Sequence, residues 1–435
     1  MRIEPPTYPL TPKALDAALR TGHGRAKQQI FAHGAYGLED EVINACVSCL
    51  TYDPQCEADR APWLFSIIDR AKLTQKVLKA LETAVREPAP DSHRDMVQWS
   101  GILKELAEAG SADARRLLYA SLRRLPHTSD VVGAEQIVAL DGVAGLIHVA
   151  RQLGRWLEAD PGFWVDDYLS AELDPSIDAE AARAALECEA ETDADVAIFL
   201  AGVRKTREAL TSNPGRPDRS GLTGAQVVAL IEGNPREQCH WLRQWGFKAA
   251  ADQRDVVFTS LLMSNEPEHV KRLFRCFAKT GIPRFDHRLL RWLANSDEQV
   301  QWSAVTALAH VKHADLRQAA LRLIVDGDMA NGITLLANNF EAGDFALCFE
   351  HLKPLADADD AHHLVGSLLD LCEAHPGAEA LDCLLYVYEL SPCSACRSRA
   401  VKALIASGTA PAWVLKESAS DADPGIRALV SAACS

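Results

Sequence analysis

The chain has 435 residues with a net charge of −15, and 48 % of its residues are hydrophobic while 24 % are charged. This length exceeds the size of one compact core, so we expect two or more domains or an elongated repeat array. The composition excludes a largely disordered chain, and the acidic balance disfavours binding to phosphate backbones, so a nucleic-acid partner is not expected.

Three features of the sequence predict a cytoplasmic protein. No run of about 18 apolar residues occurs, which predicts no membrane-spanning helix and no membrane partner. Residues 1–19 lack a continuous apolar segment, so we expect no secretion signal. The 12 cysteines are then expected to be reduced thiols that pack as small hydrophobic side chains.

Apolar residues recur with a helical period along most of the chain. Val42, Ala45, Cys46, Cys49 and Leu50 have the spacing i, i+3, i+4, i+7, i+8, which buries one face of a helix. The same spacing recurs in three later stretches, 316–324, 365–372 and 381–388. Long runs that alternate apolar and polar residues are missing, so no sheet is expected. The predicted fold class is all-α.

Turn and capping signals predict how the helices are grouped. Thr223 and Gln226 have the spacing of a capping box ahead of an apolar run. The segment TSNPGRPDRSG holds two prolines, two glycines and no apolar residue, which is typical of a linker. We therefore expect an N-terminal helical-repeat region, a linker and a C-terminal repeat region, at residues 1–210, 211–221 and 222–435.

One local pattern recurs: an acid at a turn, then an aliphatic residue, a basic or amide residue and small residues on the inner face. The clearest copies are Asp297/Val300/Gln301, Asp315/Leu316/Arg317 and Asp423/Ile426/Arg427. These residues resemble HEAT repeats, most clearly from about residue 292 to the C-terminus and divergently before residue 211. The resemblance implies a superhelical array of antiparallel helix pairs, an α-solenoid, with an Asp–Arg hydrogen-bonded ladder between units.

Signatures of catalysis are missing from the sequence. It contains no GxxxxGK[ST] phosphate loop, no GxGxxG after a strand, no GxSxG elbow and no HExxH. Some HEAT-like proteins are di-iron hydroxylases that use several His-Glu dipeptides, and this chain has none. The sequence therefore predicts a protein that is not an enzyme and needs no cofactor.

Two Cys-x-x-Cys pairs are candidate metal or redox sites. Cys46 and Cys49 fall on an apolar stripe, which favours simple core packing. Cys393 and Cys396 straddle a predicted helix start, where the helix N-terminus lowers a thiol pKa. Further ligands of a local zinc site would come from Cys372, Cys383 or Cys434.

Histidines near carboxylates form a second group of candidate metal ligands. His310 and His313 lie three residues apart close to Asp315, and His362 and His363 follow a pair of aspartates. Imidazole and carboxylate groups together bind zinc or iron. A polar turn between two helices is the simpler interpretation of both pairs.

Tryptophan and arginine residues are the candidate partner-binding groups, because both are common hot spots of protein interfaces. Trp241 and Trp245 bracket Arg243, one helical turn apart. Trp302 falls off the stripe set by the apolar residues around it, so we expect its side chain to be exposed. Packing between repeats is the alternative for all of these tryptophans.

The stretch YDPQCEADRAPW, residues 52–63, differs from its surroundings. Asp53 ahead of a proline is a good helix N-cap, and a second proline restarts a helix further on. Capping does not require Glu57, Arg60 or Trp63. Because binding residues often lie on such turns, these residues and Asp53 are candidates for a partner-binding surface.

The predicted function is that of a non-enzymatic HEAT-like scaffold or adaptor that binds another protein through its solenoid surface. The net acidic charge suggests a partner with a basic surface or peptide. Two alternatives stay open. One is a metal-dependent enzyme or regulator built on helical repeats, using His310 and His313 or the C-terminal cysteines. The other is a nucleic-acid-handling HEAT-like protein.

Overall fold

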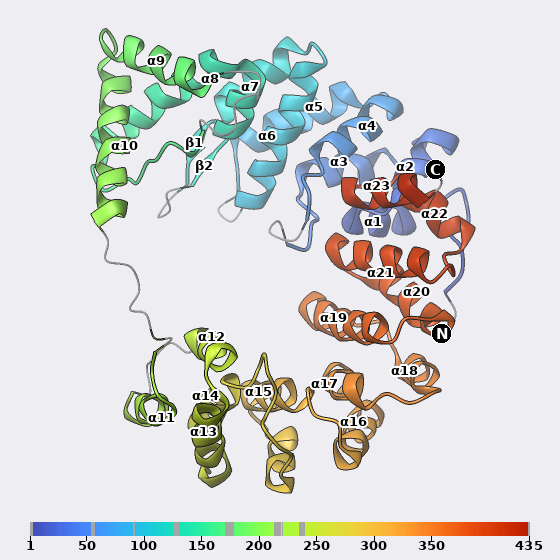
Figure 1. Cartoon of the computed structure of the whole chain (residues 1–435). Coiled ribbons are helices and arrows are strands. Elements are labelled where there is room, and N and C mark those ends of the chain that lie inside the picture. The colour runs from blue at the N-terminus through green and yellow to red at the C-terminus, as the bar shows by residue number, and fades with distance from the viewer. Residues whose placement is uncertain are drawn as a thin grey trace. The chain divides into compact units, whose positions relative to one another are not determined.

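Helices make up the fold, so the predicted all-α class is confirmed (Figure 1). The computed structural model describes residues 3–53, 57–89, 92–125, 130–169, 178–212, 219, 221–234 and 240–433. In these ranges the strands are β1 (Arg123–Arg124) and β2 (Val131–Val132), which pair antiparallel. This two-residue ladder lies between α7 and α8 in the chain, and the helical periodicity did not predict it.

The chain forms two compact units. The terminal unit consists of Pro6–Gly215 together with Lys416–Ser435, and the central unit consists of Arg216–Leu415 with Met1–Pro5. One division falls between residues 215 and 216, inside the segment predicted as a linker, of which 213–218 and 220 lie outside the described residues. A second falls between residues 5 and 6, and a third inside helix α22 (Ala412–Ser418), so the C-terminal residues belong with the N-terminal helices.

Two rows of helices build the terminal unit. One row is α1, α3, α5 and α7, and the other is α2, α4, α6, α8 and α10, each helix packing on the next in its row. The bounds are α1 (Pro12–Thr21), α2 (Gly24–His33), α3 (Glu39–Val47), α4 (Ala61–Ala71), α5 (Thr74–Arg86), α6 (His93–Glu108), α7 (Ala112–Ser121), α8 (Ala134–Ala159), α9 (Ala179–Ala190), α10 (Ala194–Ser212) and α23 (Pro424–Ala433).

The central unit repeats this plan. Helices α15, α17, α19 and α21 form one row, and η2, α16, α18 and α20 form the other. The bounds are α11 (Gly224–Gly233), α12 (His240–Lys248), α13 (Ala251–Met263), α14 (Pro267–Arg275), η2 (His287–Ala294), α15 (Glu298–Leu308), α16 (Ala314–Asp326), α17 (Met329–Leu336), η3 (Ala337–Asn339), α18 (Asp344–His351), α19 (Ala358–Ala374), η4 (Ala378–Ala380), α20 (Leu381–Leu390) and α21 (Ser394–Ala406).

Most residues of the predicted helix faces are buried, and Leu323 and Leu381 are half-buried. Val42, Ala45 and Cys46 are buried in α3, as the periodicity predicts. The stripe does not continue, because α3 ends at Val47 and Cys49 is only half-buried beyond it. The capping box of α11 is confirmed: the Thr223 hydroxyl accepts from the N–H of Gln226, and the Gln226 side chain accepts from the N–H of Thr223 at 2.9 Å.

Hydrogen-bonded rungs join next-but-one helices in the central unit. Gln301 in α15 donates to the Asp328 carboxylate before α17 at 2.8 Å. Arg317 in α16 donates to both carboxylate oxygens of Asp344 at the start of α18, at 2.6 and 2.9 Å. The acids of the recurring sequence pattern do not accept these bonds; Asp297, for example, caps its own helix. Each rung therefore links the first turns of two helices in the same row.

Among the described residues, one helix, α8, is long and apolar enough to cross a membrane, judged by length and composition alone. Its apolar window is 44 % buried, and the helix packs on α10, α6 and α9 inside the terminal unit. A core helix of a soluble protein passes the same test, so this is weak evidence for a membrane span.

The C-terminal residues pack directly on the start of the chain (Figure 1). Nδ1 of His23 lies 3.1 Å from Oε1 of Glu417, and Arg25 binds both carboxylate oxygens of the same side chain. A Cβ added at Gly24 would lie only 1.9 Å from the Glu417 carbonyl oxygen, so a side chain there would force the two segments apart. Burial alone raises the pKa of Glu417, but hydrogen bonds and charges from His23 and Arg25 outweigh it and lower the pKa to about 2.

We expect Glu417→Gln to lower the free energy of unfolding at pH 7 by about 3 kcal/mol, because it leaves the nearly buried Arg25 without its carboxylate. The folded-state pKa of Glu417 lies below its ordinary value of 4.5. Its stabilisation is therefore complete above pH 4.5 and is lost as the pH falls toward 2. The difference between wild type and variant should narrow over that window, and urea unfolding at a series of pH values measures it.

Glu82→Gln is the matched control, since Glu82 is a half-exposed carboxylate paired with Arg86 on α5 at 3.0 Å. Exposed pairs of this kind contribute little, so its stability should stay close to that of wild type. A Glu417→Gln protein as stable as wild type at pH 7, or a difference that does not change with pH, would contradict the assigned role of the buried carboxylate.

Candidate functional site

Two recesses of the central unit lie on the row α15, α17, α19 and α21. One cavity of about 660 Å³ is lined by residues of all four helices. A second, of about 830 Å³, adjoins it near the starts of α15, α17 and α19. Trp302 and His363 line both cavities, so the two recesses form one continuous candidate surface, called here the row surface.

Trp302 is the main aromatic group of the row surface. Its side chain is 42 % exposed, which confirms the exposure expected from its place off the apolar stripe. The ring packs edge-on against the ring of His363, with 4.6 Å between the ring centroids. This contact fixes the indole where it lines both cavities, and a large part of the side chain stays exposed.

A cysteine–histidine cluster lies at the edge of the row surface. The ligand atoms of His362, Cys393 and Cys396 all lie within 4.8 Å of one another. His362 belongs to the second turn of α19, Cys393 is the N-cap of α21, and Cys396 lies in the first turn of α21. His362 and Cys396 also line the 660 Å³ cavity, so the cluster opens toward it.

The Cys393 thiol of this cluster differs electrostatically from two other buried thiols, those of Cys348 and Cys372. Burial raises the pKa of Cys348 and of Cys372 to about 12. The pKa of Cys393 is instead lowered to about 6, chiefly by the hydrogen bond from Cys396, with help from backbone N–H groups of α21 and from His362. Burial opposes this change, but the donors at the helix N-terminus outweigh it.

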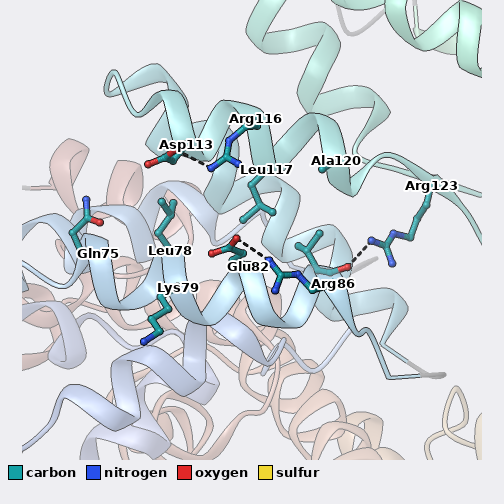
Figure 2. A pocket seen from close by; sticks show the side chains of 11 residues that line it. Gln75, Leu78, Lys79, Glu82, Arg86, Asp113, Arg116, Leu117, Ala120 and Arg123 are labelled. Carbon is teal, nitrogen blue, oxygen red and sulfur yellow. Dashed lines mark hydrogen bonds and ion pairs between the residues drawn. The ribbon is translucent and has the colours of Figure 1, made fainter.

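Figure 2 shows a different cavity, of about 570 Å³, between α5 and α7 in the terminal unit. Its arginines are already engaged: Arg86 pairs with Glu82 at 3.0 Å and Arg116 with Asp113 at 2.9 Å. Arg123 donates to a backbone carbonyl of α5 at 2.8 Å. Because these cations are paired with their own neighbours, we place the candidate site on the row surface.

The candidate partner-binding residues of the stretch 52–63 are mostly buried within the terminal unit. Arg60 is 5 % exposed, pairs with the buried carboxylate of Glu57, and donates to the carbonyls of Leu19 and Arg20 at the end of α1. The Glu57 carboxylate also accepts from the N–H of Tyr52 at 2.7 Å. These charges join α1 to α4, so Glu57 and Arg60 have a structural role and present little surface to a partner.

Trp63 is buried for a related reason. It is 4 % exposed, and its indole N–H donates to the carbonyl of Ser420 at 3.0 Å. Its contact is therefore with the C-terminal segment of the same unit. Asp53 is half-buried, and Pro54, with which it was expected to begin a helix, lies outside the described residues.

The Trp241 to Trp245 segment supplies less exposed surface than expected. Trp245 is 2 % exposed and donates to the carbonyl of Leu222 at 2.8 Å, so it packs inside the unit. Trp241 is half-buried, with the guanidinium of Arg219 4.8 Å from its ring centroid. Arg243 is exposed. The packing alternative therefore holds for Trp245.

The two histidines proposed as metal ligands have other contacts. His313 is the N-cap of α16, where its Nδ1 accepts from the N–H of Asp315 at 3.2 Å and its ring stacks on Phe285. Nε2 of His310 lies 3.2 Å from the carbonyl oxygen of Ala278. Capping occupies the Nδ1 lone pair of His313, which favours the polar-turn interpretation of this pair.

Sequence reasoning identified Cys393 and Cys396 and considered Cys372, Cys383 or Cys434 as further ligands, whereas the structure places His362 beside the two cysteines. Cys372 and Cys383, the expected neighbours, are buried core residues with raised pKa values, and Cys434 lies outside the described residues. The signal that would have found His362 is its place near the start of α19. The starts of next-but-one helices lie side by side in this fold, as both hydrogen-bonded rungs show.

We expect Arg60→Ala to destabilise the terminal unit by about 3 kcal/mol or more, because it leaves the buried Glu57 carboxylate uncompensated. The double variant Glu57→Ala/Arg60→Ala should lose less than the sum of the two single variants, since it removes the orphaned charge. Chemical unfolding of all four proteins measures this coupling. Additive losses, or a fully stable Arg60→Ala protein, would contradict a structural role.

Comparisons with known proteins leave the HEAT resemblance as a prediction. No family model matches the chain, and no curated protein matches it. The resemblance therefore continues to rest on the recurring sequence pattern, alongside the two-row packing within each unit. Function has to be argued from the geometry of the site itself.

Proposed function

We propose that this protein is a non-enzymatic, cytoplasmic scaffold or adaptor with a HEAT-like α-solenoid fold, and that it binds another protein through the row surface. Trp302 carries the proposal: a large aromatic side chain, 42 % exposed, stands between two adjoining cavities. An aromatic anchor beside recesses that a partner can fill is the usual centre of binding energy in protein interfaces. The cavities are large enough to take several side chains of an extended segment.

The charges of the row surface favour a basic partner segment. Five carboxylates line the two cavities, against one lysine and one arginine: Glu298, Asp328, Asp359, Asp360 and Asp370, with Lys353 and Arg399. Arg399 is itself held by Asp370 and Glu373, at 2.7 and 2.8 Å. A partner arginine stacked on Trp302 would gain a cation–π contact with carboxylates close by.

The rival functions receive less support from this surface. Carboxylates along both cavities repel a phosphate backbone, which disfavours nucleic acid as the occupant. The non-enzymatic part of the proposal rests on the missing catalytic signatures of the sequence. An acidic recess with an aromatic anchor favours peptide recognition by charge and stacking.

Trp302→Ala is expected to weaken binding of a basic peptide about 10-fold, because it removes the stacking surface for an arginine. The probe is a fluorescent peptide of alternating arginine and serine, and fluorescence anisotropy at low salt measures its dissociation constant. Binding should weaken as salt is raised, because the carboxylates supply part of the attraction.

Trp164→Ala is the matched control, since Trp164 is a similarly exposed tryptophan, at 47 %, in the terminal unit. It should bind the peptide as wild type does. A glutamate–serine peptide of the same length should not bind. The proposal fails if the basic peptide does not bind, or if Trp302→Ala and Trp164→Ala have equal effects.

A further inference from the structure

The cluster of His362, Cys393 and Cys396 has the donor set and spacing of a metal site. In a tetrahedral zinc site with Zn–S bonds of about 2.3 Å, neighbouring ligand atoms lie roughly 3.5–3.8 Å apart. The three atoms here already lie within 4.8 Å of one another, so a contraction of at most about 1.3 Å brings them to that spacing. Side-chain rotation alone covers such a distance.

The position of the cluster in the fold is a second observation that indicates a metal site. Rungs join the first turns of α15 and α17 through Gln301 and Asp328, and those of α16 and α18 through Arg317 and Asp344. At the equivalent place between α19 and α21 stand an imidazole and two thiols. A metal ion held by these groups would link α19 to α21 as the hydrogen bonds link the other helices.

The backbone at Cys393 is also arranged to hold a thiolate. The Ser391 hydroxyl, fully buried, donates to the Cys393 carbonyl at 2.9 Å and accepts from the Cys393 N–H at 3.2 Å, which fixes the turn. Backbone N–H groups of Ala395 and Cys396 then donate to the Cys393 sulfur. Thiolate is the form that a metal binds, so these donors favour coordination.

We propose that Cys393, Cys396 and His362 bind one zinc ion, with the fourth position open to the 660 Å³ cavity and occupied by water. Binding forms two Zn–S bonds and one Zn–N bond, and each cysteine that begins as a thiol releases its proton to solvent, with no change of oxidation state. The mixture of two thiolates and one imidazole suits zinc, a borderline-soft cation, better than the oxygen-preferring magnesium or calcium. The site does not depend on the proposed protein binding.

A disulfide between Cys393 and Cys396 is the competing use of the same residues. Forming it would need an oxidant, and the imidazole of His362 would have no role in it. The imidazole placed within 4.8 Å of both sulfurs therefore favours coordination over a dithiol switch. Both cysteines are also largely buried, at 1 % and 7 % exposure, which limits access for a redox partner.

Cobalt substitution of the full-length protein tests the site. Reduced, metal-stripped protein titrated with Co²⁺ should develop thiolate-to-cobalt charge-transfer bands in the near ultraviolet that saturate at one equivalent, and Zn²⁺ should abolish them. Zinc binding in weak buffer should release two protons per protein when the thiols begin protonated. Cys393→Ser and Cys396→Ser should each lose the wild-type spectrum, and His362→Ala should bind at least 10-fold more weakly.

Two matched variants keep the test specific. His363→Ala removes the next residue, which lines the same cavity but lies outside the cluster, and Cys49→Ser alters the other Cys-x-x-Cys pair. Both should bind cobalt as wild type does, and circular dichroism confirms that every variant is folded. The proposal is overturned if wild type gives no thiolate band, or if the Cys393→Ser/Cys396→Ser double variant keeps it. Loss of two thiols in air that zinc does not prevent would favour the disulfide instead.

Discussion

A buried carboxylate at Glu417 determines how the terminal unit is assembled. Isolated in the interior, it would strongly prefer to be neutral, but His23 and Arg25 hold it ionised. Because Glu417 is near the C-terminus and its partners are near the N-terminus, this contact makes one unit from both ends of the chain. The first helices of a stacked array have an open face, and here the returning C-terminal residues bind them through the Glu417 carboxylate and through the N–H of Ala422, which donates to the carbonyl of Gly22.

The same region explains the unusual composition of residues 52–63. Arg60 ties the carbonyl end of α1 to the start of α4, and Trp63 reaches the carbonyl of Ser420. These contacts bring three separate segments to one place: the end of α1, the start of α4 and the returning C-terminus. A charged pair and a tryptophan suit such a junction, because backbone carbonyls left over at a helix end need donors.

How far the sequence predicts this structure depends on the range of each interaction. Helix faces such as Leu316, Ala320 and Ile324 follow from local spacing, and the Thr223 cap needs only three residues. The burial of Trp63 depends on a contact 357 residues away, with a backbone carbonyl that any residue would supply. No residue pattern can specify such a partner. The stripe through Cys46 failed at Cys49 for a local reason: the helix stops two residues earlier.

The cysteine–histidine cluster depends on both local sequence signals and a packing contact between helices, and the packing contact is not visible in the sequence. The sequence contains both parts of the cluster: a Cys-x-x-Cys pair at the start of one helix and a histidine near the start of another. What joins them is the packing of the row, in which the start of one helix lies beside the start of the next but one. Between α19 and α21, that packing places His362 opposite Cys393 and Cys396 without any appeal to a known family. The cavity that His362 and Cys396 share with Trp302 follows from the same packing, because one row of helices supplies all three side chains.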